Sequence, residues 1–483
     1  MRQDQPFKDT NVLVFGLGLL GGGVATTNWL LDQGARVTVT DLKSEVELAA
    51  SVRKVDAHIK RSSRDGSQYD DYRSRLTWRL GGHDEAMVRE ADIIVVNPDV
   101  PKSSVYLKLA HEAQKPLLNE AGIFYSLWKK PTIGITGTRG KTTTAIWAGH
   151  LLDGHTKSVV TGNSTVTPFL SVFSSSFKAR PKLAVTELPS FLLEHFDAAP
   201  DIAVVTNIYR DHLNRYEGFE DYVKTKAAVF LKQGSQGHLV LNADDDWTPF
   251  LESLKPAATI WHVSISPLAG GKGLYLDGDQ AWFLSERGMA ERVLDVSDVV
   301  TTQGEHGTRN FIAAAMAARL AGCPWSVIQA RSRTLPSVPY RQETVHRSAK
   351  LTVVNDTCAT SPDGAVAALR RWGGPNCILI AGGTDRDLEY DAWAKEIVGR
   401  IKPENTFLLA GTATDKMRTA LKRSARGRRT FDTLEDCLKA AKTRAATYVN
   451  AVILFTPGAK SFGPFKNEYD RGQAFNRLVK KHF

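Results

Sequence analysis

Short apolar runs alternate with amphipathic stretches along most of the chain, and they predict strands and helices in turn. Runs rich in Val, Ile and Leu lie at residues 11–15, 37–41, 91–98, 133–136, 159–163, 183–187 and 202–207. A second series lies at residues 351–355, 378–381, 406–410 and 451–455. Buried strands that alternate with helices are typical of mostly parallel sheets covered by helices. The pattern therefore predicts an α/β fold.

Three stretches depart from this alternation. Residues 44–76 are polar and charged, and part of this stretch is predicted to be a surface insertion. Residues 257–302 resemble short strands joined by glycine turns, and residues 304–310 are expected to open an alanine-rich helix over residues 311–321.

The first predicted strand runs into a glycine loop, Gly16-Leu17-Gly18-Leu19-Leu20-Gly21, and the second ends at Asp41. Three glycines between a strand and a helix, with an acid about twenty residues on, are the dinucleotide fingerprint. Taken alone, this pattern predicts NAD and a Rossmann dehydrogenase. A second nucleotide loop further on argues against NAD, so the pattern predicts a nucleotide diphosphate at a helix N-terminus.

That second loop follows the apolar run at residues 133–136 and reads Gly137-Thr138-Arg139-Gly140-Lys141-Thr142-Thr143-Thr144. Glycines let backbone N–H groups wrap a polyphosphate, Lys141 reaches the outer phosphates and Thr142 can hold Mg²⁺. The usual pattern requires glycine where this chain has Ile135, so the match fails by one residue. The alternative is a glycine turn without a ligand, but a lysine and hydroxyls at a helix start have no packing use.

Polar residues end three of the predicted strands, namely Asn163, Glu187 and Asn207. Parallel strands present ligand groups at their carboxyl ends. We therefore expect these side chains near the phosphates.

Composition narrows the function classes. The length of 483 residues suggests about three domains. The net charge is +10, but the basic residues are spread along the chain, which favours nucleotide and carboxylate substrates and no nucleic acid. The polar residues 1–10 contain no signal peptide, and no apolar run is long enough to insert into a membrane. Four widely spaced cysteines without metal-type spacing favour free thiols and a cytoplasmic protein.

Taken together, these motifs resemble the Mur ligase family, most closely the type that adds D-glutamate to UDP-N-acetylmuramoyl-L-alanine. The matching landmarks run from residue 11 to residue 480. They are the first glycine loop, Thr136 to Thr143, Glu187-Leu188 with Ser190-Phe191, Asn207 with Asp211-His212 and Arg215-Tyr216, Tyr222 with Lys226, His306 with Asn310, Arg341, Asn355-Asp356-Thr357 with Ala359-Thr360, and Pro457, Ala459, Ser461, Phe465-Lys466 and Arg471-Gly472.

The resemblance implies three domains and a reaction. Residues 1–121 would form a Rossmann-like domain that binds the UDP-sugar. Residues 122–339 would form a central P-loop ATPase with a mostly parallel sheet, and residues 340–483 a Rossmann-like domain that binds the amino acid. A monomeric, cytoplasmic enzyme would use ATP and two Mg²⁺ ions to form an amide through an acyl phosphate, in peptidoglycan precursor synthesis.

The resemblance also implies residue roles. The catalytic residues would be Lys141, Glu187, His212 and Lys226, with Thr142, Glu187, His212 and a carbamylated Lys226 as metal ligands. ATP would contact Gly137, Thr138, Arg139, Gly140, Lys141, Thr142, Thr143, Asn310, Arg341 and Asp356. The UDP-sugar would contact Gly18, Leu19, Leu20, Asp41, Asn163 and Ser190, and the amino acid would contact Thr360, Arg386 and Ser461.

Simpler interpretations stand beside these roles. Glu187 can be a strand-end carboxylate, His212 a turn histidine and Lys226 an exposed helix lysine. Arg341 and Asp356 can form a plain salt bridge.

This chain also departs from the family pattern, at Leu20, Asp99, Pro189, Leu192, Gly307, Cys358, Arg386 and Glu468. Arg386 replaces a lysine, and arginine still binds a carboxylate through two hydrogen bonds. These departures leave open a related Mur-type ligase for another amino acid, or a non-catalytic nucleotide-binding homologue.

Overall fold

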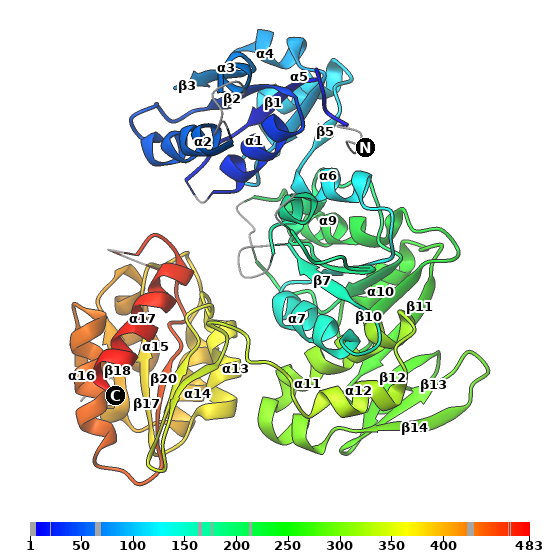
Figure 1. Cartoon of the computed structure of the whole chain (residues 1–483). Coiled ribbons are helices and arrows are strands. Elements are labelled where there is room, and N and C mark those ends of the chain that lie inside the picture. Colours follow the sequence, from blue (N-terminus) through cyan, green and yellow to red (C-terminus); the bar gives the residue numbers. More distant parts are fainter. Residues whose placement is uncertain are drawn as a thin grey trace. The chain divides into compact units, whose positions relative to one another are not determined.

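The computed structural model describes residues 6–19, 21–62, 69–162, 167–174, 177–211, 215–422, 429–461, 463 and 465–483. The chain forms two compact units (Figure 1). The first comprises Met1–Val296 and Arg309–Arg333, and the second comprises Ser297–Thr308 and Thr334–Phe483.

The first unit begins with a five-stranded parallel sheet in the order β3-β2-β1-β4-β5. In this order β1 is the central strand of the sheet, with β2 and β4 on its two sides, as in dinucleotide-binding folds. The strands are β1 (Asn11–Phe15), β2 (Arg36–Asp41), β3 (Leu76–Leu80), β4 (Ile93–Val96) and β5 (Leu117–Leu118). The helices are α1 (Gly22–Asp32), α2 (Ala49–Ser62), α3 (Tyr69–Ser74), α4 (Glu85–Glu90) and α5 (Val105–Glu112).

Much of the polar stretch at residues 44–76 is helical, and residues 63–68 within it lie outside the described residues. It forms α2 and α3, and α2 buries Val52, Val55 and Ile59 in the core shared with β1 and β2. These apolar residues are spaced three and four positions apart, which is the helical period. The high content of charged residues hid this period in the sequence.

The first unit continues with a nine-stranded sheet in the order β14-β13-β12-β11-β10-β9-β6-β8-β7. Its strands pair in parallel from β7 to β12, and β13 and β14 add an antiparallel edge. The strands are β6 (Thr132–Thr136), β7 (Ser158–Thr161), β8 (Leu183–Glu187), β9 (Ile202–Val205), β10 (His238–Asn242), β11 (Thr259–Ser264), β12 (Gly273–Asp277), β13 (Gln280–Leu284) and β14 (Ala290–Asp295).

Helices accompany this sheet and bring the site residues to it. Every residue of β6 and β8 is buried, which explains their continuous apolar runs. The helices are α6 (Glu120–Leu127), α7 (Lys141–Leu152), η1 (Phe169–Phe173), α8 (Ser190–Leu193), α9 (Phe219–Leu231), α10 (Thr248–Ser253) and α12 (Trp325–Ser332).

Helix α11 (Ser297–Leu320) begins earlier than the sequence indicated. Gly304 has a φ of 67°, so two helical segments meet there at a kink. The first segment belongs to the second unit, and the alanine-rich part belongs to the first. The expected helix over residues 311–321 is therefore the second half of a longer element.

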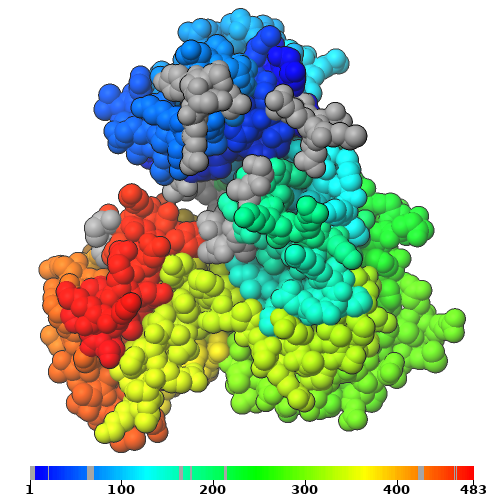
Figure 2. Space-filling model, in the orientation of Figure 1, coloured from blue at the N-terminus to red at the C-terminus, as the bar shows by residue number. Residues whose placement is uncertain are grey.

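The second unit contains a six-stranded sheet in the order β15-β16-β20-β17-β18-β19, parallel except for the edge strand β15. Its elements are β15 (Glu343–Arg347), β16 (Leu351–Asn355), α13 (Pro362–Trp372), β17 (Cys377–Ala381), α14 (Asp391–Arg400), η2 (Pro403–Asn405), β18 (Thr406–Leu409), α15 (Thr412–Leu421), β19 (Arg429–Phe431), α16 (Leu434–Ala445), β20 (Ala451–Phe455) and α17 (Glu468–His482). Figure 2 shows the orange and red segments of this unit as one continuous surface.

The predicted fold class is confirmed, because all three sheets are mostly parallel and carry helices. The predicted strands at residues 351–355 and 451–455 coincide with β16 and β20, which pair along their whole length. Among the residues that the structure describes, no helix has both the length and the apolar character needed to cross a bilayer.

Candidate active site

The phosphate loop connects β6 to α7 and is held by the segment that follows β9. Thr138 donates its backbone N–H to Asn207 O at 2.8 Å, and Arg139 donates its own to Asn207 Oδ1 at 2.8 Å. The Thr206 hydroxyl donates to Arg139 O at 2.6 Å. These bonds fix the loop in one shape, and Asn207 lies beside it as its strand-end position predicted.

Two glycines of the loop lie where a side chain does not fit. A Cβ on Gly137 would lie 2.0 Å from Thr206 Oγ1, and a Cβ on Gly140 would lie 2.1 Å from Asn310 Oδ1. Gly140 also has a φ of 84°, which L-residues rarely adopt. Asn310 of α11 thus packs directly against the phosphate loop, and its contact with ATP, which the resemblance implies, stays a prediction.

We expect Gly140→Ala to weaken adenine-nucleotide binding about tenfold or more, because the new methyl group would displace Asn310 and reshape the loop. Gly154→Ala is the matched control, since Gly154 has a similar φ of 89° with open space around its missing Cβ. Titration calorimetry with ADP measures the effect. Equal weakening by the two substitutions would assign the loss to backbone strain alone.

Lys141 and Lys226 converge on one carbonyl of the loop. The Lys141 ammonium donates to Gly137 O at 3.0 Å, and Lys226 Nζ donates to the same oxygen at 2.8 Å. Lys226 is only 1% exposed, so it is not the ordinary surface lysine that was the simpler interpretation. Burial, and then the charge of Lys141, lower the pKa of Lys226 well below its usual value.

Glu187 lies at the end of β8, next to the first turn of α7. The Thr142 hydroxyl donates to Glu187 Oε2 at 3.0 Å, and both side chains are buried. Gly162 packs closely on Glu187, because a Cβ on Gly162 would lie 2.9 Å from the Cβ of Glu187. A hydroxyl and a carboxylate are the hard oxygen donors that Mg²⁺ prefers. The pair therefore fits a Mg²⁺ site beside the phosphates.

Two predicted residues of this region, Asn163 and His212, lie outside the described residues. Within the described ranges no group of three or more His, Cys, Asp or Glu side chains is placed to hold a metal ion. The metal roles of Thr142, Glu187, His212 and Lys226 stay predictions.

The first glycine loop is organised by Asp41. Its Oδ2 accepts the backbone N–H groups of Leu17 and Gly18, each at 3.0 Å, and its Oδ1 accepts that of Lys43 at 2.9 Å. The carboxylate at the end of β2 thus binds the loop itself. Leu19 is 52% exposed at the same loop, and Leu20 lies outside the described residues.

Ser190 belongs to a buried polar cluster that the sequence did not reveal. Burial raises the pKa of Tyr216, against a hydrogen bond from Ser190 that lowers it. The Tyr216 hydroxyl donates to Glu194 Oε1 at 3.0 Å, and Arg215 donates to both oxygens of Glu194 at 2.6 and 2.7 Å. Glu194 is 21 positions from Arg215, so no local spacing could have indicated this pair.

In the second unit, Asp356 follows β16 and is buried. Its Oδ1 accepts the backbone N–H of Gln342 at 3.0 Å, and its Oδ2 accepts the Thr456 hydroxyl at 2.8 Å. Burial raises the pKa of Asp356 to about 7, against the effect of these hydrogen bonds and of Arg341. The geometry gives Asp356 partners within its own unit, and its predicted contact with ATP stays a prediction.

His306 gives the second unit a distinct response to acid. Its Nε2 lies 2.8 Å from Gln342 Nε2 and accepts from that amide, while Gln342 Oε1 accepts from Arg371 and Trp372. Burial, and then the charge of Arg371, lower the pKa of His306 to about 4. The neutral imidazole is therefore the form that this network holds.

We expect His306 to contribute a loss of stability to the second unit as the pH falls from about 6.5 to about 4, at about 1 kcal/mol per pH unit, whereas Asp356, whose pKa is raised, contributes in the opposite direction in the wild type and in the variant alike. The pKa of His306 is lower in the folded state than in the unfolded chain, so the unfolded chain binds more protons in that window. His306→Gln keeps an acceptor near Nε2 and removes the titration. Chemical unfolding of both proteins at about pH 5 and about pH 7 tests this; an equal pH response would contradict it.

The three predicted amino-acid contacts lie on loops after adjacent strands. Thr360 follows β16, Ser461 follows β20 and Arg386 follows β17, and these strands are neighbours in the order β16-β20-β17. The backbones of Thr384 and Lys460 exchange two hydrogen bonds at 3.0 and 3.2 Å, which join the last two loops. The side chain of Arg386 is exposed. Their binding roles stay predictions.

Arg471 of α17 lies beneath these loops and is fully buried. Its Nε donates to Thr357 Oγ1 at 2.9 Å, and its Nη2 donates to Thr357 O and Ala459 O at 2.9 and 3.2 Å. One guanidinium therefore ties the loop after β16 to the loop after β20. The sequence placed Arg471 in a motif but not in this structural role.

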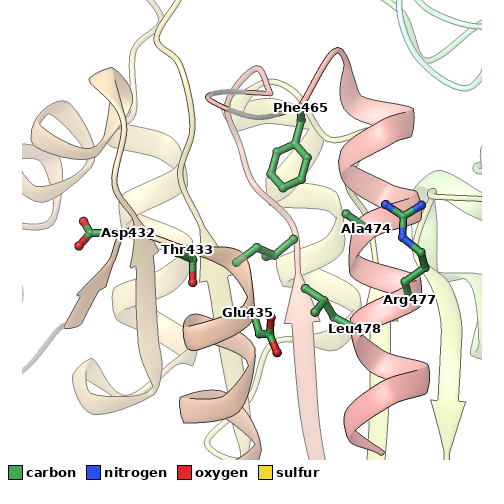
Figure 3. Close-up of a pocket in the computed structure, with 8 residues that line it drawn as sticks. Asp432, Thr433, Glu435, Phe465, Ala474, Arg477 and Leu478 are labelled. Carbon is green, nitrogen blue, oxygen red and sulfur yellow. The ribbon is translucent and has the colours of Figure 1, made fainter.

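A pocket of about 300 Å³ opens elsewhere in the second unit. In Figure 3, Phe465 reaches from the segment before α17 toward Ala474 and Leu478 of that helix, with Thr433 and Glu435 at the start of α16. Its lining contains none of Thr360, Arg386 and Ser461. The pocket is thus separate from the predicted amino-acid site.

Several known proteins, all of them ligases by name, are similar to this chain. A model of the Mur ligase middle domain matches residues 135–318. UDP-N-acetylmuramoylalanine–D-glutamate ligase of Roseiflexus sp. (strain RS-1) is 35% identical over 487 residues, with 97% of each chain covered. The enzyme of the same name from Borreliella afzelii (strain PKo) is 31% identical, with 99% of each chain covered.

Solved structures agree on the fold. UDP-N-acetylmuramate-alanine ligase of Thermotoga maritima covers 98% of this chain and all of its own, with a TM-score of 0.56 and 16% identity. The MurF ligase of the same organism, solved with ADP, covers 100% of both chains with a TM-score of 0.54 and 16% identity. At such identities the likeness concerns the fold alone. The sequence relatives extend over nearly the whole chain, and on that ground this chain belongs to the Mur ligase family.

Proposed function

We propose that the chain is an ATP-dependent, ADP-forming ligase that joins D-glutamate to UDP-N-acetylmuramoyl-L-alanine in peptidoglycan precursor synthesis. The observation that carries the proposal is the buried Lys226, which shares the Gly137 carbonyl of the phosphate loop with Lys141. A cation at the phosphate loop with a second, buried lysine beside it suits a reaction that brings a carboxylate to a triphosphate. Relatives with the same name as that activity support the choice of substrates.

The phosphate loop supplies the electrostatic part of the reaction. Attack of a carboxylate on the γ-phosphate brings two anions together, and positioned cations lower that barrier. Lys141 would exchange its loop carbonyls for phosphate oxygens, while the α7 N-terminus presents backbone N–H groups. Thr142 and Glu187 are the residues that fit Mg²⁺, which would neutralise charge on the phosphates when bound.

We further propose that Lys226 is carbamylated. Only a neutral amine reacts with CO₂, and burial, which lowers the pKa of Lys226, favours that form. Formation of a bond between Lys226 Nζ and the carbon of CO₂ releases one proton. The nitrogen keeps one N–H, which can still donate to Gly137 O. The carboxylate so formed would serve, with His212, as a second Mg²⁺ ligand set. This exchanges a cation that repels Lys141 for an anion that attracts it.

On the substrate side, we propose that Gly18, Leu19, Leu20, Asp41, Asn163 and Ser190 contact the UDP-sugar. Thr360, Arg386 and Ser461 would contact the amino acid. Asp41 shapes the glycine loop, and exposed Leu19 offers an apolar surface for a nucleotide base. The neighbouring loops after β16, β20 and β17 support the amino-acid assignment. The amine of D-glutamate would then displace phosphate from the acyl phosphate.

We propose three domains, at residues 1–121, 122–339 and 340–483. Each of these stretches contains all the strands of one sheet, which supports the boundaries. We also propose a cytoplasmic monomer. The four cysteines are free thiols, which suits a reducing compartment. Light scattering coupled to size exclusion tests the monomer directly.

The deciding experiment for the function is product analysis by mass spectrometry. Purified protein is given ATP, Mg²⁺ and UDP-N-acetylmuramoyl-L-alanine with D-glutamate, L-glutamate, D-aspartate or glycine. We expect one product, heavier by a D-glutamate residue, with equimolar ADP and phosphate. Exclusive use of another amino acid would assign a related ligase, and no ATP turnover with any amino acid would refute the enzymatic function.

A further inference from the structure

A short segment after β4 links the two loops of the first unit. Residues 97–102, called here the bridging segment, begin against the first glycine loop. Asn97 donates its backbone N–H to Phe15 O at 3.0 Å, and a Cβ on Gly16 would lie 2.9 Å from the Cβ of Asn97. At this end the segment therefore packs on the backbone of the glycine loop.

The other end of the bridging segment is held by α9 and its preceding residues. Lys102 Nζ donates to Thr225 Oγ1 at 3.0 Å and to Asp221 Oδ1 at 3.3 Å. The same ammonium lies 5.0 Å from the centre of the Tyr216 ring, within the range of a cation–π contact. A carboxylate, a hydroxyl and an aromatic ring thus converge on the ammonium group of Lys102.

A second anchor adjoins the first. Arg215 Nη2 donates to the backbone oxygen of Val100 at 2.9 Å, and Nη2 and Nε also donate to Glu194, whose side chain is 1% exposed. This anchor binds only backbone of the bridging segment. Lys102 is the residue whose own side chain reaches across from the segment.

Helix α9 carries the bridging segment's contacts to the phosphate loop. Thr225 and Asp221, which accept from Lys102, lie on α9 with Lys226, and Lys226 donates to Gly137 O at 2.8 Å. A continuous chain of contacts therefore runs from Gly16 through Asn97, Lys102 and α9 to the phosphate loop.

We infer that Lys102 is a positioning residue whose ammonium group fixes the bridging segment on α9 and so sets the glycine loop relative to the phosphate loop. One substrate molecule must bind at the first loop and react at the second, so their relative position determines whether its carboxylate is in place. The inference rests on the proposed function in that it takes the sugar nucleotide to bind at the glycine loop.

Lysine suits this role physically. Its long stem spans the gap, and its ammonium can serve a hydroxyl, a carboxylate and an aromatic face together. The side chain of Lys102 is 33% exposed, so water and salt weaken the ion pair. The expected effect is accordingly moderate, and it should appear in substrate alignment before it appears in global stability.

The test compares Lys102→Met, Lys102→Arg and the control Lys224→Met. Lys224 lies on α9 and pairs with Glu220 at the surface, so its loss removes a cation from the same helix without touching the bridging segment. We expect Lys102→Met to lower kcat/KM for the sugar nucleotide about fivefold, with the KM for ATP unchanged. Lys102→Arg should recover most of the loss, and Lys224→Met should match the wild type.

Hydrogen exchange supplies a readout that does not depend on catalysis. In Lys102→Met, but not in Lys224→Met, amides of residues 97–104 should exchange faster. Unchanged exchange would overturn the inference even if kcat/KM fell. An equal rise of KM for all three substrates, together with a lower Tm, would also overturn it in favour of a purely structural role. If the wild type makes no amide product, the proposed function fails, while the exchange comparison still decides the role of Lys102.

Discussion

Lys226→Met is expected to lower the rate of amide formation about 10³-fold or more. The substitution removes the only atom of this side chain that can carry a carbamate. The fold should tolerate it, because replacing a buried charge by an apolar side chain of similar volume is often neutral or stabilising. The Lys226 side chain is 1% exposed, so the unfolding temperature should stay at or above that of the wild type.

The carbamate itself can be tested on the unmodified chain. We expect removal of dissolved CO₂ and bicarbonate to lower wild-type activity, and added bicarbonate to restore it. The variant should not respond to either treatment. Lys224→Met, two residues away on the exposed face of α9, should keep normal activity. Near-normal ligation by Lys226→Met would disprove the carbamate.

Lys141→Ala is expected to abolish measurable phosphoryl transfer, with a loss of about 10³-fold in kcat/KM for ATP. Lys141 donates to Gly137 O and Thr138 O at 3.0 and 3.1 Å, so its ammonium already lies over the loop that receives the phosphates. Without it, charge that develops on the γ-phosphate lacks its nearest protein cation. ADP binding should also weaken, since Lys141 is proposed to contact the outer phosphates before the reaction begins.

Trapping with hydroxylamine separates the chemical step from binding in this variant. At saturating ATP, the wild type should form an acyl phosphate that hydroxylamine traps, and Lys141→Ala should not. Lys108→Ala, which removes an exposed lysine of α5, serves as the control. Trapping at the wild-type rate by Lys141→Ala would remove Lys141 from the reaction.

Much of the active site could be predicted because its residues follow strands in short motifs. A strand, a glycine loop, a lysine and a hydroxyl are contiguous from residue 133 to residue 144, so a single local conformation brings them together. Glu187 and Asn207 lie beside the phosphate loop for a related reason. Glu187 ends β8 and Asn207 follows β9, and both strands pair in parallel with β6, so they end at the same edge of the sheet.

Other features could not be predicted, because they depend on contacts between distant segments. The Glu194–Arg215 pair joins residues that lie 21 positions apart in the sequence. The Lys102 contacts join residues more than a hundred positions apart. The helix α2 was not predicted within residues 44–76, because the charged residues there outnumber the few apolar residues that α2 buries. The start of α11 at Ser297 was missed because a glycine kink interrupts its pattern.

The alternation of strands and helices, the phosphate loop and the family could all be predicted from the amino-acid sequence, because each depends on residues that are close together in the chain. The tertiary structure decided that Lys226 is buried rather than exposed and that it shares an oxygen with Lys141. It also decided that Asp41 binds its own loop and that Asn310 closes against Gly140. Burial and pairing set the pKa and reach of a side chain, and both arise only when segments distant in sequence pack together.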